Sequence, residues 1–447
     1  MQITRIELWR VAVPLPAPFY PSWIPGFEQQ ENRFDLIRLV TASGLEGWSA
    51  AQCMSSERSG LGSLLGNYLL GERADDIANI RQRVREMSYL GWRVGWIEAA
   101  CWDIVGKARG KPIYQLLGGE PLESVRGYAS TGQVRSGAER VKEVEARLSE
   151  GFEGVKLRVH AETLEEDLEQ LEVTRKGVGD AAILGVDANQ AWRVAAIGDA
   201  PLWDEARALA FCRGAEAQGF TWVEEPLAMD DYAAQARLRE ATEIAITGGE
   251  LNNQGLPEFG VMIGRGCYDW YQPDAVFTGG IAETWAIIQA IDHGGAAYSP
   301  HTWTNGVGFA INLQLFAASR WREEKLLEYP YDPPGWVPEG RDGILVEPWS
   351  AEKGRIPVPD GPGLGIEIDG RALRRHGTRY FVGTAGRVAL NAVLDRGLGL
   401  AKRLGATRQA RLEARRRALE ANPGDPALEE VERLVRFAHS MLPTDGR

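Results

Sequence analysis

The feature that most constrains the fold is a regular alternation of strand-like and helix-like segments between residues 126 and 329. Short apolar runs of strand length recur there, and the segments between them carry the Leu, Ala and Ile spacing of helices. Eight such runs with seven clear helices between them favour a parallel α/β barrel over an open doubly wound sheet, whose strands are fewer. The strands are expected at 126–131, 153–159, 182–187, 220–224, 245–250, 268–274, 296–300 and 326–329.

The sequence on either side of this alternation predicts further parts. Residues 1–119 begin with a strand pattern and continue with helical spacing, which predicts an α+β domain before a barrel at 120–330. Residues 331–373 carry loops and short strands and are expected to fold back on the first domain, and 374–447 predicts a helical C-terminal extension. The apolar side of 426–442 is typical of a helix that packs on the protein or on another subunit.

Charge and cysteine usage narrow the class of protein. A net charge of −12 argues against general nucleic-acid binding, because such binding needs a basic surface. The charge is uneven: the chain from Arg374 onward carries +7 and the rest −19. With no leader-like segment and no apolar run of membrane-spanning length, we expect a cytoplasmic protein with no membrane partner. No CxxC spacing links the four cysteines, so reduced, buried thiols are expected at Cys53, Cys101, Cys212 and Cys267.

Three acidic residues stand where successive predicted strands end, namely Asp187, Glu224 and Glu250. One acid after a strand most often caps the next helix. Three of them at the carboxyl ends of neighbouring barrel strands would converge on one rim and repel each other unless a cation lay between them. Because carboxylate oxygens favour a hard divalent ion, the pattern predicts a site for Mg²⁺, with Mn²⁺ as second choice.

Lys156 and Arg158 lie two residues apart on one predicted strand and therefore face the same side. Their structural use would be to neutralise the neighbouring acids. Their functional use would be to hold a substrate carboxylate and the charge that develops on it. Both interpretations predict that the two cations point into the barrel mouth.

Asp274 and His301 fall at the ends of the sixth and seventh predicted strands, and Glu328 lies at the eighth. A lone histidine is usually a packing residue. A carboxylate on the adjacent strand, however, fixes the tautomer of a histidine and raises its basicity. The pair His301 and Asp274 is therefore a candidate acid/base, and Glu328 completes the ring of charged residues.

The segment Pro14 to Phe27 is rich in proline and aromatic residues, so no regular element is expected there. It is either a surface loop with anchoring aromatics or a lid that excludes water from a bound ligand. In the second interpretation Phe19, Tyr20 and Trp23 contact the substrate, as does Trp303 near the seventh strand end.

Taken in order, these residues resemble the mandelate racemase subgroup of the enolase superfamily over about residues 1–373. The resemblance is carried by Lys156-x-Arg158, Asp187-x-Asn189, Glu224-Glu225-Pro226, Gly249-Glu250, Pro273-Asp274, Gly279-Gly280, His301 and Glu328. It implies an α+β capping domain over a modified (β/α)7β TIM barrel. It also implies an enzyme that removes the proton α to the carboxylate of a small-molecule acid. It also implies a symmetric homo-oligomer.

The resemblance assigns a role to each site residue. Asp187, Glu224 and Glu250 would bind Mg²⁺, and His301 with Asp274 would be one acid/base. Lys156 would steady the substrate carboxylate, Glu328 would hydrogen-bond the enediolate, and Asn189 would reach a substrate hydroxyl.

Arg158 departs from the family pattern, which is Lys-x-Lys with the second lysine as a base opposite the histidine. Arginine is a poor proton acceptor near neutral pH. With one competent base, elimination of water is the expected reaction, and the resemblance to the sugar-acid dehydratases of this subgroup implies an aldonate- or aldarate-like substrate. The alternatives are a racemase or epimerase that uses Arg158 as a base, and a catalytically silent structural or regulatory homologue. This chain also has an insertion around Arg193 to Pro201 that the family pattern lacks. The inserted loop is predicted either to narrow the site or to lie at its rim without a role in it.

Overall fold

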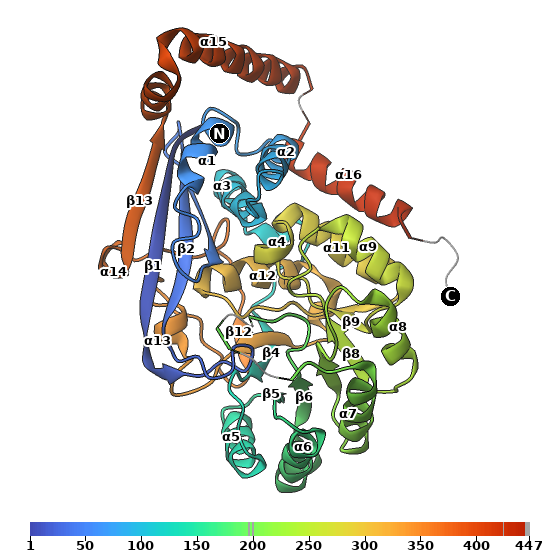
Figure 1. Cartoon of the computed structure of the whole chain (residues 1–447). Coiled ribbons are helices and arrows are strands. Elements are labelled where there is room, and N and C mark those ends of the chain that lie inside the picture. The colour runs from blue at the N-terminus through green and yellow to red at the C-terminus, as the bar shows by residue number, and fades with distance from the viewer. Residues whose placement is uncertain (195–196, 199–200, 423, 443–447) are drawn as a thin grey trace.

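Eight parallel strands form the core of the computed structural model, which describes residues 1–194, 197–198, 201–422 and 424–442 (Figure 1). Each predicted strand of the barrel is present and largely buried, because most of its side chains are apolar. The strands are β4 (Ser124–Ser130), β5 (Gly154–Arg158), β6 (Ile183–Asp187), β7 (Trp222–Glu224), β8 (Ala245–Gly248), β9 (Trp270–Tyr271), β10 (Ala297–Tyr298) and β11 (Leu327–Pro330).

The order of these strands is β10-β9-β8-β7-β6-β5-β4-β11, with β12 (Arg355–Pro357) antiparallel on β4. Side-chain hydrogen bonds bring the two end strands together. Ser299 Oγ donates to the carbonyl oxygen of Leu326 at 2.9 Å, and Thr302 Oγ1 donates to that of Glu328 at 2.8 Å. The parallel sheet is therefore curled into the predicted barrel.

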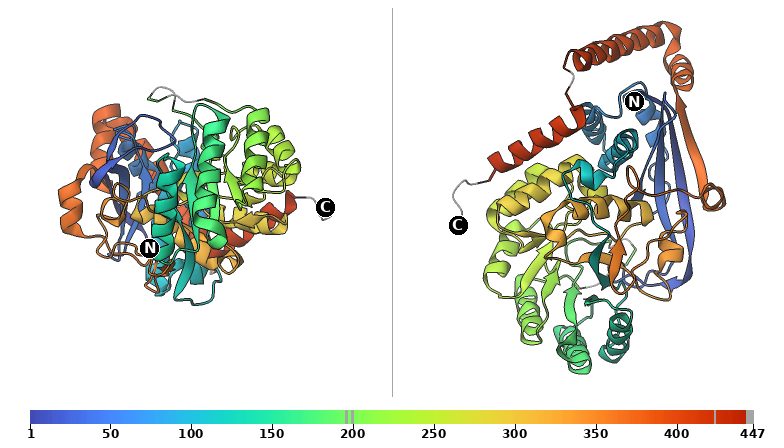
Figure 2. Two further views of the ribbon diagram at one scale, coloured as in Figure 1. Left: turned by 90° about the horizontal axis from the view of Figure 1, so that it is seen from below. Right: turned by 180° about the vertical axis from the view of Figure 1, so that it is seen from behind.

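Helices cover the outside of this sheet (Figures 1 and 2). Two of them begin at capping boxes, Ser136 with Glu139 and Thr163 with Glu166, which satisfy the free amide groups of the first turn. They are α5 (Gly137–Ser149), α6 (Leu164–Val178), α7 (Glu205–Ala217), α8 (Tyr232–Glu240), α9 (Leu256–Arg265), α10 (Ala275–Thr278), α11 (Ile281–His293) and α12 (Gly306–Ala318), with short 3-10 turns η2 (Gly179–Ala181) and η3 (Arg320–Arg322).

An antiparallel sheet of order β13-β1-β2-β3 lies beside the barrel. Its N-terminal strands are β1 (Ile3–Phe19), β2 (Gln29–Thr41) and β3 (Glu46–Gln52), followed by α1 (Leu61–Leu69), α2 (Ile77–Ser88), η1 (Gly95–Ile97), α3 (Glu98–Arg109) and α4 (Ile113–Leu116). The prediction that no regular element covers Pro14 to Phe27 was wrong for its first part. Pro14 still pairs with Glu31, and Phe19 pairs with Gln29 after a shift in register. The long partner strand β2 therefore keeps this proline-rich segment extended.

Glu98, the first residue of α3, ties this N-terminal unit to the barrel. Its buried carboxylate accepts hydrogen bonds from the amides of Ile281, at 2.7 Å, and Ala282, at 3.1 Å, and so caps α11. Arg81 on α2 adds an ion pair of 2.8 Å with Glu283 on α11. These contacts hold the N-terminal unit at a fixed place over the barrel.

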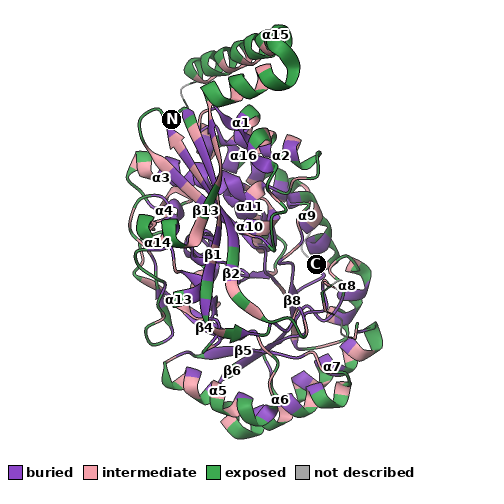
Figure 3. Ribbon diagram, turned by 60° about the vertical axis from the view of Figure 1, so that its left-hand side comes forward, coloured by how far each residue is buried: buried purple, intermediate pink, exposed green. Residues whose placement is uncertain are grey.

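The C-terminal part contains α13 (Pro338–Arg341), α14 (Gly370–His376), β13 (Gly377–Thr384), α15 (Ala385–Ala421) and α16 (Pro426–Ser440). The predicted helical extension is confirmed by α15 and α16, and α16 packs its apolar side on α11 and α2 as expected of a packing helix. Strand β13 was not predicted. It pairs with β1 and forms the outer strand of the antiparallel sheet. The strands of the barrel are largely buried, whereas β13 is mostly half-buried or exposed and α15 is largely exposed (Figure 3).

All four cysteines are free and buried, as predicted. Among the described residues, no helix is long and apolar enough to cross a membrane.

Candidate active site

The three predicted metal ligands lie on neighbouring strands at the carboxyl end of the barrel. Asp187 ends β6, Glu224 ends β7 directly beside it, and Glu250 follows β8 by two residues; all three are buried. Glu224 Oε2 accepts a hydrogen bond from Gln272 Nε2 at 2.8 Å, and Glu250 Oε1 accepts one from Trp192 Nε1 at 3.2 Å. Strand register therefore brings the three acids to one rim.

Lys156 lies among these acids with its side chain fully buried. Its Nζ is 2.5 Å from Glu224 Oε1, 2.8 Å from Glu328 Oε1 and 3.7 Å from Asp187 Oδ2. Burial raises the pKa of Glu224 to about 7, an effect that Lys156 opposes. In the part of the chain that the structure describes, no three Asp, Glu, His or Cys side chains have the spacing of a preformed metal centre, and cations contact the acids instead.

The donor set nevertheless fits a hard divalent ion. Glu225, next to Glu224, is a fourth buried carboxylate, and its Oε2 has no hydrogen-bond partner among the described atoms. Burial and the neighbouring acids Glu250 and Asp187 raise the pKa of Glu225 well above its ordinary value. A bound cation would reduce the electrostatic repulsion between these neighbouring carboxylates.

His301 and Asp274 form the predicted pair. The ring Nδ1 of His301 is 2.9 Å from Asp274 Oδ2, and Asp274 Oδ1 accepts hydrogen bonds from Asn312 Nδ2 at 2.7 Å and from the Val276 amide at 2.8 Å. Burial opposes the charged imidazolium, but Glu250, Glu328 and Asp274 outweigh it and raise the pKa of His301 to about 9. The other ring nitrogen, Nε2, lies 3.3 Å from Glu250 Oε2, at the metal-ligand side of the site.

Glu328 is surrounded by hydrogen-bond donors. Its Oε1 accepts from Ser130 Oγ at 2.8 Å and faces Lys156, and its Oε2 accepts from the Thr302 amide at 2.6 Å. Burial favours the neutral acid, but Lys156 and His301 outweigh it and hold the pKa of Glu328 below its ordinary value. An ionised carboxylate can only accept hydrogen bonds, so this environment favours a role in positioning Lys156.

Arg158 is held on every side. Its Nη1 pairs with Asp187 Oδ2, its Nε donates to the Thr131 carbonyl oxygen at 2.6 Å, and its guanidinium carbon lies 5.3 Å and 5.2 Å from the ring centroids of Trp23 and Trp303. Burial alone would lower the pKa of Arg158, but Asp187 and the other acids raise it above its ordinary value. Arg158 is therefore a fixed cation in this structure.

The loop after β1 lies on the site. Ser22 Oγ is hydrogen-bonded to Asn189 Oδ1 at 2.6 Å, and Asn189 Oδ1 also accepts from Arg158 at 3.3 Å. A Cβ added to Gly198 would come within 2.4 Å of the Pro25 carbonyl oxygen, so part of the Arg193 to Pro201 segment touches this loop. Residues 195, 196, 199 and 200 of that segment lie outside the described residues.

The predicted substrate-contacting aromatics divide into two groups. Trp23 and Trp303 flank Arg158, and Phe19 packs on both from a fully buried position, with centroid distances of 5.9 Å and 5.8 Å. Tyr20 is 45% exposed and donates its hydroxyl to Glu28 at 2.5 Å, so it is not gathered with the others.

Sequence reasoning missed several residues of the site, among them Ser22, Gln272 and Trp192. Gln272 stands at the end of the sixth strand beside Pro273-Asp274, a position that could have drawn attention. No local pattern marks Ser22 or Trp192, because each reaches the site through a loop.

Two family profiles match the chain. Residues 5–118 match the mandelate racemase / muconate lactonizing enzyme N-terminal domain, and residues 139–372 match the enolase C-terminal domain-like family. The chain therefore belongs to the mandelate racemase / muconate lactonizing enzyme family of the enolase superfamily.

Individual relatives cover most of the chain. It is 30% identical to D-galactarolactone cycloisomerase of Agrobacterium fabrum, over 78% of this chain and 93% of the relative. It is 32% identical to arabinonate dehydratase of Saccharolobus solfataricus, over 77% and 91% respectively. The crystal structure of L-talarate/galactarate dehydratase from Salmonella typhimurium liganded with Mg and L-lyxarohydroxamate superposes with a TM-score of 0.70 at 26% identity, over 85% of this chain and 93% of that one. Relatives of this chain thus include sugar-acid dehydratases, cycloisomerases and racemases.

Proposed function

We propose that this protein is a Mg²⁺-dependent dehydratase of a sugar acid, with His301 as its single acid/base. The observation that carries the proposal is the position of Arg158. Arg158 stands where the family pattern has its second base. Its ion pair with Asp187, its hydrogen bond to the Thr131 carbonyl oxygen and the two flanking tryptophans fix a permanent cation at that place. Only one side of the substrate then meets a side chain that can both accept and return a proton, namely His301.

His301 would act through Nε2, because Nδ1 faces Asp274. Neutral imidazole removes the proton on the carbon next to the substrate carboxylate, and the electron pair left on that carbon expels the hydroxyl of the next carbon. The imidazolium returns the proton to that leaving oxygen, so water departs and an enol remains. The enol tautomerises to a 2-keto-3-deoxy acid.

The substrate carboxylate would lie beside Lys156. Lys156 Nζ is fixed between Glu224 and Glu328, and Ser130 and the Thr302 amide hold Glu328 in place. A cation fixed in this way stabilises the negative charge that develops on the carboxylate when the proton leaves, without reorganising during the reaction.

Asp187, Glu224 and Glu250 would hold the Mg²⁺ ion. A bound Mg²⁺ neutralises the substrate carboxylate and makes the neighbouring proton more acidic. The Mg-containing crystal structures of related dehydratases support this part of the proposal.

The substrate would be an aldonate or aldarate. Asn189 lies at the rim with its Oδ1 shared by Ser22 and Arg158, so a substrate hydroxyl could enter this hydrogen-bond network. Several relatives are named for dehydration of such acids, which supports the substrate class.

A panel of aldonates and aldarates incubated with the protein and Mg²⁺ tests the proposal, with keto acid detected by semicarbazide and the reaction followed by NMR in D₂O. Dehydration predicts a keto acid and the loss of one water. Exchange of the α-proton without loss of water would identify a racemase or epimerase instead. No turnover of any acid, with Mg²⁺ bound, would favour a catalytically silent homologue.

A further inference from the structure

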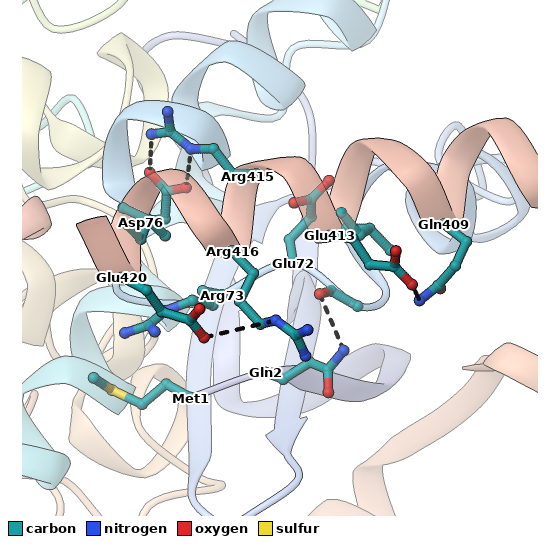
Figure 4. Close-up of a pocket in the computed structure, with 13 residues that line it drawn as sticks. Met1, Gln2, Glu72, Arg73, Asp76, Gln409, Glu413, Arg415, Arg416 and Glu420 are labelled. Carbon is teal, nitrogen blue, oxygen red and sulfur yellow. Dashed lines mark hydrogen bonds and ion pairs between the residues drawn. The ribbon is translucent and has the colours of Figure 1, made fainter. Parts of the chain in front are cut away.

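The cavity between α15 and the N-terminus, about 200 Å³ in volume, has charged walls that serve to hold the helix in place (Figure 4). Arg415 binds Asp76 through two hydrogen bonds of 2.6 and 2.7 Å, and Arg411 binds Glu72 at 2.5 Å. These ion pairs fasten α15 to the N-terminal unit. A polar group that is left without a partner lies instead at the mouth of the barrel.

Ser22, in the loop after β1, is fastened to three different loops of the barrel. Its amide donates to the carbonyl oxygen of Gly132, after β4, at 2.8 Å, and its Oγ donates to Oδ1 of Asn189, after β6, at 2.6 Å. Its carbonyl oxygen lies 2.8 Å from Nδ1 of His160, after β5, and this nitrogen is the donor because a carbonyl oxygen only accepts. Ser22 is 3% exposed, so the barrel satisfies each of its polar groups.

The hydrogen bond from Ser22 decides which way the side-chain amide of Asn189 faces. Oδ1 of Asn189 accepts from Ser22 Oγ and, at 3.3 Å, from Nη1 of Arg158, and arginine can only donate. Nδ2 of Asn189 therefore points away from both groups. It has no hydrogen-bond partner among the described residues and is not sealed from solvent, so it stays accessible to a ligand.

Asn189 is also fixed through its backbone. It adopts a φ of 47°, in the left-handed region that asparagine tolerates better than most residues, and its amide donates to Asp187 Oδ1 at 2.8 Å. The other carboxylate oxygen of Asp187 pairs with Arg158. Because the backbone is held in this way, the orientation of the side-chain amide is what the loop after β1 controls.

The same loop closes the surroundings of this amide. Trp23 lies 5.3 Å from the guanidinium carbon of Arg158 and meets Trp303 edge-on, with ring centroids 5.3 Å apart. Arg158 is 2% exposed beneath these rings. A hydrogen bond that Asn189 makes beside them is stronger than one made in water, because the surroundings have a low dielectric constant.

We propose that Ser22 is a positioning residue of the substrate site. Its hydroxyl holds Oδ1 of Asn189, so that Nδ2 donates a hydrogen bond to an oxygen atom of the bound acid. Without this hydroxyl only the longer bond from Arg158 opposes rotation of the amide, which can then turn Oδ1 toward the acid. The role rests on the proposed function, because it requires a hydroxylated acid at Asn189.

A double-mutant cycle tests this role, with the binding of each aldonate and aldarate of the panel measured by calorimetry in the presence of Mg²⁺. All proteins of the cycle carry His301→Asn, so that no acid is consumed. Ser22→Ala should weaken binding about 2–10-fold, the net effect of one hydrogen bond. In the Asn189→Ala background the same change should have less than about a two-fold effect, because Ser22 acts through Asn189. Ser319→Ala, at a serine 2% exposed that bonds to the Phe316 carbonyl oxygen, is the matched control and should bind like the parent.

Hydrogen exchange of residues 20–28 separates this role from a purely structural one. Ser22→Ala keeps the bonds to Gly132 and His160, so the loop should stay protected, whereas His160→Ala should raise its exchange. A loop that opens equally in both variants would overturn the positioning role. So would a loss of affinity from Ser22→Ala that persists in full in the Asn189→Ala background.

The proposed reaction and the role of Ser22 fail in different ways. Formation of keto acid, with independent effects of Ser22 and Asn189 on binding, would overturn the role of Ser22 alone. Binding without turnover when His301 is intact, together with coupled effects of Ser22 and Asn189, would end the proposed dehydration and leave the role of Ser22 standing. No binding of any acid by the wild type would overturn both.

Discussion

His301 Nδ1 lies 2.9 Å from Asp274 Oδ2, across the ends of two adjacent strands. Asn312 and the Val276 amide hold the aspartate, so the histidine ring is fixed with its other nitrogen facing Glu250. This orientation leaves Nε2 as the nitrogen that can exchange a proton with a substrate.

Replacing His301 with Asn should lower kcat for dehydration by about 10²–10⁴-fold, because it removes the acid/base. Mg²⁺ binding should persist, since His301 is not a proposed ligand. Keto-acid formation measures the first and a thermal shift with Mg²⁺ the second. His376→Asn, remote from the site, is the control. Undiminished turnover in His301→Asn would remove the central step of the proposed reaction.

Asp274→Asn should lower kcat by about 10²-fold or more while KM changes little, because the aspartate orients the histidine and does not touch the substrate. Steady-state kinetics separate the two constants. Asp292→Asn, at an aspartate paired with Arg320 on the surface, should behave like the wild type. A rise in KM without loss of kcat would instead assign Asp274 to substrate binding.

Arg158→Lys restores the family's Lys-x-Lys pattern and replaces a fixed cation with a group able to release its proton. The variant should gain α-proton exchange in D₂O that the wild type lacks on the same face of the substrate. Proton NMR of wild type and variant in parallel measures this. A folded, Mg²⁺-binding variant without any exchange would show that the arginine does not decide between elimination and racemisation.

Mg²⁺ should raise the Tm of the wild type, and a hundred-fold excess over Kd corresponds to about 2.7 kcal/mol of added stability. Glu250→Gln should lose most of this shift because a ligand oxygen loses its charge. Glu347→Gln, at an exposed acid, should retain it. Calorimetry at fixed protein concentration gives the measurement. An equal shift in all three proteins would place the ion elsewhere.

Leu434 on α16 is 4% exposed and packs where α16 meets α11 and α2. Leu434→Ala should reduce the free energy of unfolding by about 2–5 kcal/mol, through lost burial and the cavity that remains. Arg436→Ala, at a side chain 70% exposed, should change it by less than about 0.5 kcal/mol. Urea titration compares the two. A similar small effect in both would mean that α16 contributes little to holding the N-terminal unit on the barrel.

The strands of the barrel were predictable because each is a short apolar run bounded by turns, and the parallel order follows from the helices between them. The positions of Asp187, Glu224 and Asp274 at strand ends follow from the same pattern. The β1 extension and β13 were not predictable in this way. Pro14 to Phe19 is extended because it pairs with β2, and Gly377 to Thr384 is extended because it pairs with β1. Local sequence propensity does not reveal strand pairing with a segment elsewhere in the chain.

The sequence by itself therefore determined which charged side chains meet at the barrel rim, since the carboxyl ends of neighbouring parallel strands always converge. Only the tertiary structure decided what surrounds Arg158. Trp23 comes from a loop after β1 and Trp303 from the loop after β10, and they flank the same guanidinium because the antiparallel sheet packs beside the barrel mouth. The environment that holds this cation in place is made by residues more than a hundred positions apart, which only packing brings together.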